Sequence, residues 1–282
     1  MAATHIMHPH THIPCTPAPW RDLFLRHISS IPQSTFVLST LHRPSPTAPP
    51  VPRARTCVFR GLWGSLPPNE RNAAPRNPPV YESDLPVFTT DVRMEKAGEI
   101  AGDEKAAGSG GGGLVEAVFW AEEFGTQWRV RGTAWVLGPD IDGEEEEGGA
   151  RKVREVLLER MRAEGGQVDG WSWAREVTGH FGNLSPAMRG TFRNPPPGVP
   201  IQAGPVPGEG LGLGQAVEDL EDPVARENFR AVVIVPTEID QADLSDPKRP
   251  RRWLWVFRGA SYKNTLPGGE VVGEWEKVEV WP

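Results

Sequence analysis

The clearest alternation of hydrophobic and polar residues along the chain lies in the segment 127–137, QWRVRGTAWVL. Polar residues stand at every second position from its start, and Trp128 and Val130 stand between them. Because side chains alternate between the two faces of an extended strand, this pattern predicts a strand with one buried and one solvated face. The apolar segment 114–124 and the turn at 125–126 precede it, which predicts a β-hairpin.

Other segments carry weaker patterns of the same kinds. Apolar residues three and four positions apart indicate helices, whereas runs of β-branched and apolar residues between turn signals indicate strands. Proline-rich stretches indicate loops, which we expect at 44–52 and 69–79. We expect helices at 20–31, 93–100 and 150–166 and strands at 34–41, 54–61, 85–92, 114–124, 127–137, 229–239, 251–260 and 274–281.

Strands outnumber helices in this prediction, and the second to fifth strands lie too close together for crossover helices between them. This favours a mainly β fold in which an antiparallel sheet closes into a barrel, with a few flanking helices. We expect residues 1–18 to be a disordered segment and 19–282 to be a single domain. Low-complexity inserts, expected to decorate its surface, lie at about 101–113, 139–150 and 194–214.

The composition limits the classes of partner. The 282-residue chain has a formal net charge of −7, whereas a domain that binds nucleic acid non-specifically is usually basic, so we expect no nucleic-acid partner. No apolar run reaches the roughly 18 residues of a membrane-spanning helix, and we expect no membrane partner. Two cysteines, Cys15 and Cys57, favour a reducing compartment, the cytoplasm. An excess of arginine over acids in the first sixty residues resembles a mitochondrial presequence, the alternative location.

Familiar catalytic and nucleotide-binding motifs are absent from the sequence. Histidines 5, 8, 10 and 12 lie in a terminal, proline-broken segment, where we expect no specific metal site. The glycine-rich segment 208–215 follows no predicted strand, and Ser185 lacks the GxSxG frame of a nucleophile elbow. The sequence therefore supports neither hydrolytic catalysis nor a catalytic metal, and it indicates no catalytic side chain.

Cationic residues instead occur on and beside the predicted strands. Arg55 and Arg60 bracket the strand at 54–61, and Lys96 follows the strand at 85–92 at a strand-to-helix junction with free backbone N–H groups. Such groups suit a phosphate, because each charge-assisted hydrogen bond contributes about 1.5–3 kcal/mol. Side chains five positions apart point to opposite faces of a regular strand, so the two arginines favour an elongated phosphorylated ligand that runs across the strand's end.

Three segments taken together resemble the pyridoxamine 5′-phosphate oxidase-like family. They are RTCVFRG at 55–61, FTTDVRMEK at 88–96 and VEAVFWAEEFGTQWRVRG at 115–132. The segment LSPAMRGTFRNPPPG at 184–198 resembles the subfamily common in fungi, plants and cyanobacteria. The resemblance covers most of the chain from Pro19 onward. It implies an antiparallel split β-barrel that binds flavin mononucleotide (FMN) non-covalently at a homodimer interface.

The resemblance also implies which residues contact the cofactor. Lys96 would hold the phosphate, and Thr89 and Thr90 would border the flavin. A cation, Arg60 or Arg129, would stabilise the negative charge of the reduced ring. The complete implied set is Arg55, Thr56, Val58, Arg60, Thr89, Thr90, Arg93, Lys96, Gln127 and Arg129.

Several residues depart from the family pattern. Met94 replaces a subfamily serine and removes a hydroxyl group near the phosphate, and Glu95 stands where the oxidases have a phosphate-binding arginine. Both changes are expected to weaken FMN binding. The positions that hold the substrate's phosphate in the oxidases carry Phe181, Ser185 and Arg189, which do not match that family's tyrosine, arginine and serine. The resemblance therefore implies the cofactor and leaves the substrate open.

Two functions of different classes follow from this reading. The first is an FMN-dependent oxidoreductase that transfers hydride from an unidentified small substrate to flavin N5. The second is a non-catalytic flavin-binding protein with a degenerate substrate pocket, which Met94 and Glu95 favour. Binding of single-stranded nucleic acid through the eleven tryptophans conflicts with the negative charge, and haem or a deazaflavin remain as other ligands.

Overall fold

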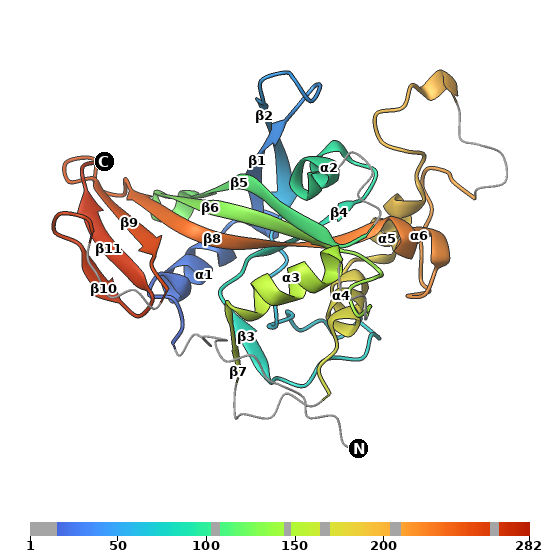
Figure 1. The fold of residues 1–282 in the computed structure, drawn as a ribbon, viewed down its shortest axis with the longest axis horizontal. Helices are drawn as coiled ribbons and strands as arrows, with labels where there is room; N and C mark the ends of the chain where they lie inside the picture. The colour runs from blue at the N-terminus through green and yellow to red at the C-terminus, as the bar shows by residue number, and fades with distance from the viewer. Residues whose placement is uncertain (1–15, 103–107, 144–147, 164–169, 204–209, 260–264) are drawn as a thin grey trace, which may run out of the picture.

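The computed structural model describes residues 16–102, 108–143, 148–163, 170–203, 210–259 and 265–282. Within these residues nine strands form one antiparallel sheet in the order β10-β11-β9-β8-β6-β5-β1-β2, with β4 paired to β8 (Figure 1). The strands are β1 Thr35–His42, β2 Val51–Val58, β4 Val87–Asp91, β5 Gly110–Ala121, β6 Thr126–Leu137, β8 Phe229–Asp243, β9 Arg251–Phe257, β10 Glu270–Val272 and β11 Trp275–Val280. The predicted antiparallel sheet is confirmed.

Backbone hydrogen bonds close part of this sheet into a barrel. Just past the end of β2, the N–H group of Arg60 donates to the Val87 carbonyl (2.7 Å), and the N–H group of Val87 donates to the Gly61 carbonyl (2.9 Å). Since β4 also pairs with β8, the strands β1, β2, β4, β8, β6 and β5 follow one another around the barrel. The sheet continues beyond the barrel through β9, β11 and β10 (Figure 1).

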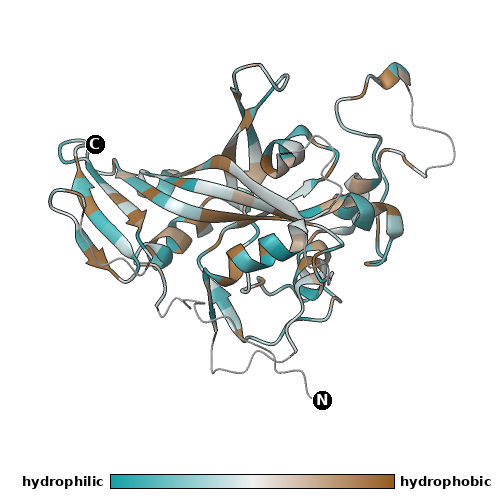
Figure 2. Ribbon diagram, viewed as in Figure 1, coloured by the Kyte–Doolittle hydropathy of each residue, from teal (hydrophilic) through white to brown (hydrophobic). Residues whose placement is uncertain are grey.

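The first hydrophobic core fills the barrel. Trp128 and Val130 of β6 are fully buried in it, whereas Arg129 on the opposite face keeps about 36% of its side chain exposed, so the predicted alternation is confirmed. Helix α1 (Arg21–Ser29) contributes Phe24 to this core, whose ring meets that of Trp128 edge to face at a centroid distance of 5.5 Å. Hydrophobic and hydrophilic residues alternate likewise along the C-terminal strands (Figure 2).

The second hydrophobic core lies on the outer face of β6 and β8. Helices α3 (Gly149–Leu158) and α4 (Trp173–Gly182) cover this face, where Val153 and Val233 are fully buried. The hydroxyl group of Ser172 caps the N-terminus of α4 by accepting a backbone N–H. Two short helices, α5 (Pro186–Gly190) and α6 (Pro223–Asn228), follow along the chain. The helix α4 was not predicted, and it becomes important for the site.

Several predicted boundaries are wrong. β2 begins at Val51, inside the expected proline loop, and ends at Val58, so Phe59 lies beyond the strand instead of in its middle. The helix expected over 150–166 ends at Leu158, and the chain then forms β7 (Met161–Ala163), which pairs with β3 (Tyr81–Ser83). The helix ends early because residues 161–163 pair with β3, which is distant in the sequence. The helical periodicity of residues 150–166 gives no information about such a pairing.

The insert expected at 101–113 is partly wrong, because Gly110–Gly113 form the start of β5. Gly113 lies so close to helix α2 (Glu95–Ala101) that a Cβ atom there would stand 2.8 Å from the Ile100 backbone. The glycines therefore allow a close approach of strand and helix. The four N-terminal histidines and Cys15 lie outside the described residues. None of the described helices is long and apolar enough to cross a membrane.

Candidate functional site

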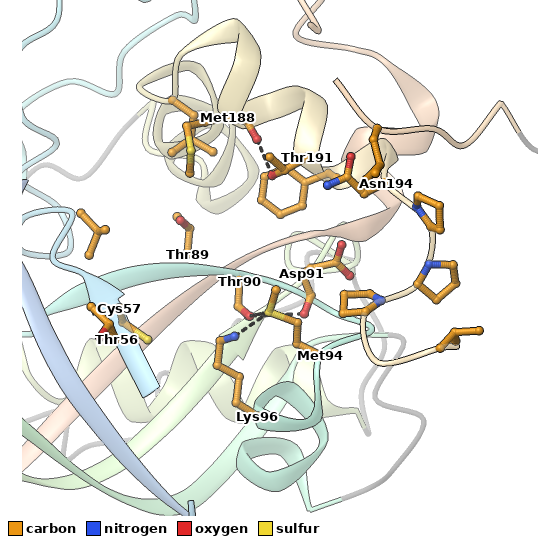
Figure 3. Close-up of a pocket in the computed structure, with 18 of the residues that line it drawn as sticks. Thr56, Cys57, Thr89, Thr90, Asp91, Met94, Lys96, Met188, Thr191 and Asn194 are labelled. Carbon is orange, nitrogen blue, oxygen red and sulfur yellow. Dashed lines mark hydrogen bonds between the residues drawn. The ribbon is translucent and has the colours of Figure 1, made fainter. Parts of the chain in front are cut away.

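A cavity of about 850 Å³ opens beside the end of β2. One wall comes from β2, β4 and the start of α2, and the other comes from the segment between Leu184 and Leu213 (Figure 3). Much of the surface is apolar, because prolines 195–197 and Phe192 face the strands. Of the residues that the family resemblance implied, Thr56, Val58, Arg60, Thr89, Thr90 and Lys96 line this cavity.

Two local turns bring these residues together. Gly61 follows β2 with φ of +99°, a conformation that glycine adopts without steric cost, and there the chain leaves the strand direction. At the end of β4, the carboxylate of Asp91 accepts the backbone N–H of Arg93 (2.8 Å). Such a turn stops the strand, and α2 begins immediately afterwards. Lys96, in the first turn of α2, therefore lies beside β2 and β4.

The ammonium group of Lys96 is poorly satisfied in this cavity. Its Nζ lies 2.7 Å from the sulfur of Met94, a thioether that is only a weak hydrogen-bond acceptor (Figure 3). Among the described residues no carboxylate forms an ion pair with it. Burial lowers the pKa of Lys96, and the charges of the Asp91 and Glu99 carboxylates oppose this effect. The cavity thus presents a partly desolvated cation with unused donors.

Arg60 is the second cation of the cavity. Within the described part of the chain its side chain makes no hydrogen bond or ion pair, and its Nε is buried without a partner. Burial lowers the pKa of this guanidinium from its ordinary value, although it stays protonated. A partly buried guanidinium without an acceptor is costly, so a ligand that offers one would bind favourably here.

Arg55 does not line this cavity. The regular strand expected from Arg55 to Arg60 is not formed, because β2 ends at Val58. The Nη2 of Arg55 donates to the carboxylate of Glu99 on α2 (2.9 Å), and its Nη1 donates to the hydroxyl of Thr40 on β1. Glu99 is only 4% exposed and also lies 3.2 Å from the imidazole Nδ1 of His42. The charge of Arg55 is therefore already balanced within the protein.

Arg93 does not line the cavity but holds its far wall. It pairs with Asp91 (2.6 Å between Nη2 and Oδ2) and donates to the backbone carbonyls of Phe192 (3.3 Å) and Asn194 (3.0 Å). The start of the insert expected at 194–214 is thereby held at the end of β4, and prolines 195–197 line the cavity. A run of prolines has a restricted backbone and can form a wall with few hydrogen bonds of its own.

Gln127 and Arg129 lie far from the cavity of their own chain. In the register of β8, Thr89 stands opposite Ala231, whereas Gln127 stands opposite Ala242. Eleven residues along a strand correspond to roughly 35 Å. Arg129 instead lies 3.8 Å from carboxylate oxygens of neighbouring strands, within a cluster of charges on the outer face of the sheet.

Some residues of the cavity carried no chemical signal in the sequence. They come from the segment that includes α5, and they are Leu184, Met188, Thr191, Phe192, Asn194 and the prolines that follow. The only available signal was the segment LSPAMRGTFRNPPPG, which marked a resemblance and indicated no position in space. Within the described residues, no group of three or more histidine, cysteine or acidic side chains is arranged to hold a metal ion.

Residues 17–138 match the model of the family described as pyridoxamine 5′-phosphate oxidase, FMN-binding domain. These residues belong to that family. The matched region contains Thr56, Arg60 and Lys96 of the cavity, whereas the wall formed by residues within 184–201 and 212–213 lies outside it. The family is one of FMN-binding domains, and the match covers 122 of the chain's 282 residues.

A comparison with solved structures found chains of similar fold. A pyridoxamine 5′-phosphate oxidase-related, FMN-binding protein from Nostoc punctiforme PCC 73102 aligns with 95% of this chain and 100% of its own, at 19% identity and a TM-score of 0.57. PhzG from Burkholderia lata 383 aligns over 100% of both chains, at 12% identity and a TM-score of 0.46. A comparison with curated proteins found no match. The first structure confirms the mainly antiparallel β fold of this family, the split barrel.

Proposed function

We propose that the chain binds FMN in the cavity beside β2 and acts with it as an oxidoreductase on a small substrate. The observation that carries the proposal is Lys96, a partly desolvated ammonium whose nearest acceptor is a thioether. The terminal phosphate of FMN would supply the charged acceptor that this group lacks. The residue stands at the position that holds the phosphate in the family that the sequence resembles.

The rest of the cavity suits the rest of the cofactor. A volume of about 850 Å³ lies within the range of small-molecule sites, and its apolar wall of prolines and Phe192 suits a flat ring system. Thr89 and Thr90 supply hydroxyl groups beside it. Arg60 supplies the cation that would face electron-rich atoms of the ring.

The residues of this chain would contribute position and charge to a reaction. FMN, when bound, supplies a ring that accepts hydride at N5. Arg60 would favour the reduced ring, because an unpaired guanidinium in a partly buried site stabilises negative charge beside it. The apolar segment around Met188 and Phe192 would exclude water from the ring. This account requires no side chain that gains or loses a proton.

A second function, flavin binding without catalysis, is favoured by two contacts. The ammonium of Lys96 donates to the sulfur of Met94, and the guanidinium of Arg55 donates to the carboxylate of Glu99. Both contacts compete with the cofactor for cations that the resemblance assigned to it: Lys96 to the phosphate and Arg55 to the flavin. Anaerobic reduction of the bound flavin by small amines, followed by peroxide release in air, distinguishes the two functions, because a non-catalytic protein would keep its flavin oxidised.

We further propose that the chain forms a homodimer through the outer face of β1 and β5. Apolar side chains on this face are between 43% and 65% exposed: Val37, Leu41, Leu114 and Trp120. Trp120 stands opposite Gln127, and Val37 stands opposite Thr56, which lines the cavity. A second copy seated here would bury this apolar surface. It would also explain how Gln127 and Arg129 could approach the cavity of a partner.

The FMN proposal is tested by Lys96→Met, which keeps the length of the side chain and removes its charge. FMN affinity should fall about 10- to 150-fold, the equivalent of one charge-assisted hydrogen bond. Riboflavin, which lacks the phosphate, should bind the variant and the wild type alike. Fluorescence titration of both flavins gives the two dissociation constants.

The control for this experiment is Lys152→Met, which removes an exposed lysine on α3. It should leave both affinities unchanged. If Lys96→Met weakened FMN and riboflavin equally, or weakened neither, the assignment of the phosphate to Lys96 would be wrong.

A further inference from the structure

A second cavity, of about 580 Å³, shares Arg60 with the first. Helix α1 forms one side of it through Leu25 and Ile28, and the loop after β2 forms another through Phe59 and Pro67. His180 on α4 also lines it. The site proposed for FMN uses none of these residues except Arg60.

His180 is the least satisfied polar side chain of this cavity. It is 1% exposed, and neither ring nitrogen has a hydrogen-bond partner among the described residues. Its ring stacks on Trp63 with centroids 5.8 Å apart and planes within 10°. Burial, and to a smaller extent the charge of Arg60, lower its pKa to about 3, so the imidazole is neutral at physiological pH. A neutral imidazole offers one donor and one acceptor, and here both are unused.

The charges around the cavity leave one cation without a partner. No carboxylate lines it in the part of the chain that the structure describes. Arg21, at its edge, forms an ion pair with Asp84 (2.9 Å between Nε and Oδ1). Arg60 has no such partner among the described residues, and its charge lowers the pKa of His180. A ligand that satisfies this cavity therefore carries a single negative charge together with groups that can bond to an imidazole.

We infer that this second cavity binds a small organic carboxylate, whose charged group lies between Arg60 and His180 and whose apolar body rests on Leu25, Ile28 and Phe59. A guanidinium donates two parallel hydrogen bonds to a carboxylate, and the imidazole N–H can donate a third. The volume suits a ligand larger than an inorganic ion. The inference does not depend on FMN binding, because the two cavities have only Arg60 in common.

The experiment compares 2-naphthoate with 2-naphthamide, which have nearly the same shape and differ in charge. Each is titrated by calorimetry into the purified full chain after removal of flavin. The acid should bind at one site per chain, at least tenfold more tightly than the amide. Arg60→Met should weaken the acid about 10- to 150-fold, and His180→Phe, which keeps the stacking on Trp63, about 3- to 10-fold. Arg53→Met removes an exposed arginine of β2 and should change nothing.

Three results would overturn the inference. They are the absence of saturable binding, equal affinity for acid and amide, and wild-type affinity in both Arg60→Met and His180→Phe. The titration is then repeated with saturating FMN. If FMN displaces the acid one for one and His180→Phe binds the acid as the wild type does, the acid occupies the first cavity and the inference fails. If the chain binds no FMN, the first titration still decides the matter.

Discussion

Single residues determine the chemistry of both cavities, because their polar groups lack the partners that buried groups normally have. Among the described residues, the ammonium of Lys96 has only a thioether as acceptor, Arg60 has no acceptor, and neither nitrogen of His180 has a partner. The sequence could identify the first two, since Lys96 and Arg60 belong to recognisable motifs. It could not identify His180, because a histidine on a helix carries no sign of whether its nitrogens will find partners after folding.

The buried state of His180 predicts a pH dependence of stability. Its pKa is near 6.5 in the unfolded chain and about 3 in the folded protein, so between these values the unfolded state binds the additional proton. The free energy of unfolding should therefore fall as pH decreases from 6.5 toward 3, with a limiting slope of about 1.4 kcal/mol per pH unit from this residue. Urea denaturation at several pH values measures the slope.

The variant for this prediction is His180→Phe, which cannot gain a proton. Its free energy of unfolding should depend less steeply on pH than that of the wild type below pH 6.5. Parallel curves for the two proteins would show that His180 is protonated in the folded state or is not buried there.

At the scale of elements, the carboxylate of Glu99 fastens α2 to β1 and β2. It lies between Arg55 of β2 and His42 of β1, and it is almost fully buried. This contact was not predictable, because the short helix and the strand were recognised separately and nothing in either pattern indicated their pairing. The segment around Asn194 shows the same limit, since its composition suggested a surface insert and Arg93 fixes it as a wall.

The Arg55–Glu99 contact predicts a measurable coupling between strand and helix. Glu99→Ala should lower the free energy of unfolding by roughly 3 kcal/mol, because it leaves the charge of a partly buried arginine without its partner. In a double-mutant cycle of Arg55→Met and Glu99→Gln, the coupling should be about 1–3 kcal/mol. The exposed pair Arg151–Glu155 serves as the control, with an expected coupling of about 0.3–0.5 kcal/mol. Equal couplings in the two cycles would contradict the role of Glu99.

At the scale of the whole molecule, the alternating strands and short connections were sufficient to predict an antiparallel barrel. Alternation along a strand shows which of its faces is buried. In segment 127–137, Trp128 is buried and its neighbour Arg129 is partly exposed. The helix α4 and the second core were missed, because the polar residues and glycines of that segment obscure its apolar face. Gln127 and Arg129, placed beside the cofactor by resemblance, lie about a strand's length from the cavity of their own chain.

The proposed homodimer predicts the effect of one substitution on its outer face. Trp120, 48% exposed, should be buried at the interface, so Trp120→Glu should convert the dimer to a monomer while the fold is retained. Sedimentation velocity measures the state, and circular dichroism checks the fold. Val272→Glu is the control, because Val272 is exposed on β10, which four strands of the sheet separate from β5. A wild-type protein that is monomeric at all concentrations would contradict the proposal.

The most direct test of the central claim is a titration of FMN and of riboflavin into the wild-type protein, followed by flavin absorbance and fluorescence. The claim is that Lys96 and Arg60 hold a phosphorylated flavin in the cavity beside β2. It predicts a yellow protein with one FMN per chain and an affinity for FMN at least about tenfold above that for riboflavin, the contribution of one charged hydrogen bond. A colourless protein that takes up neither flavin, or one that binds both equally, would contradict it.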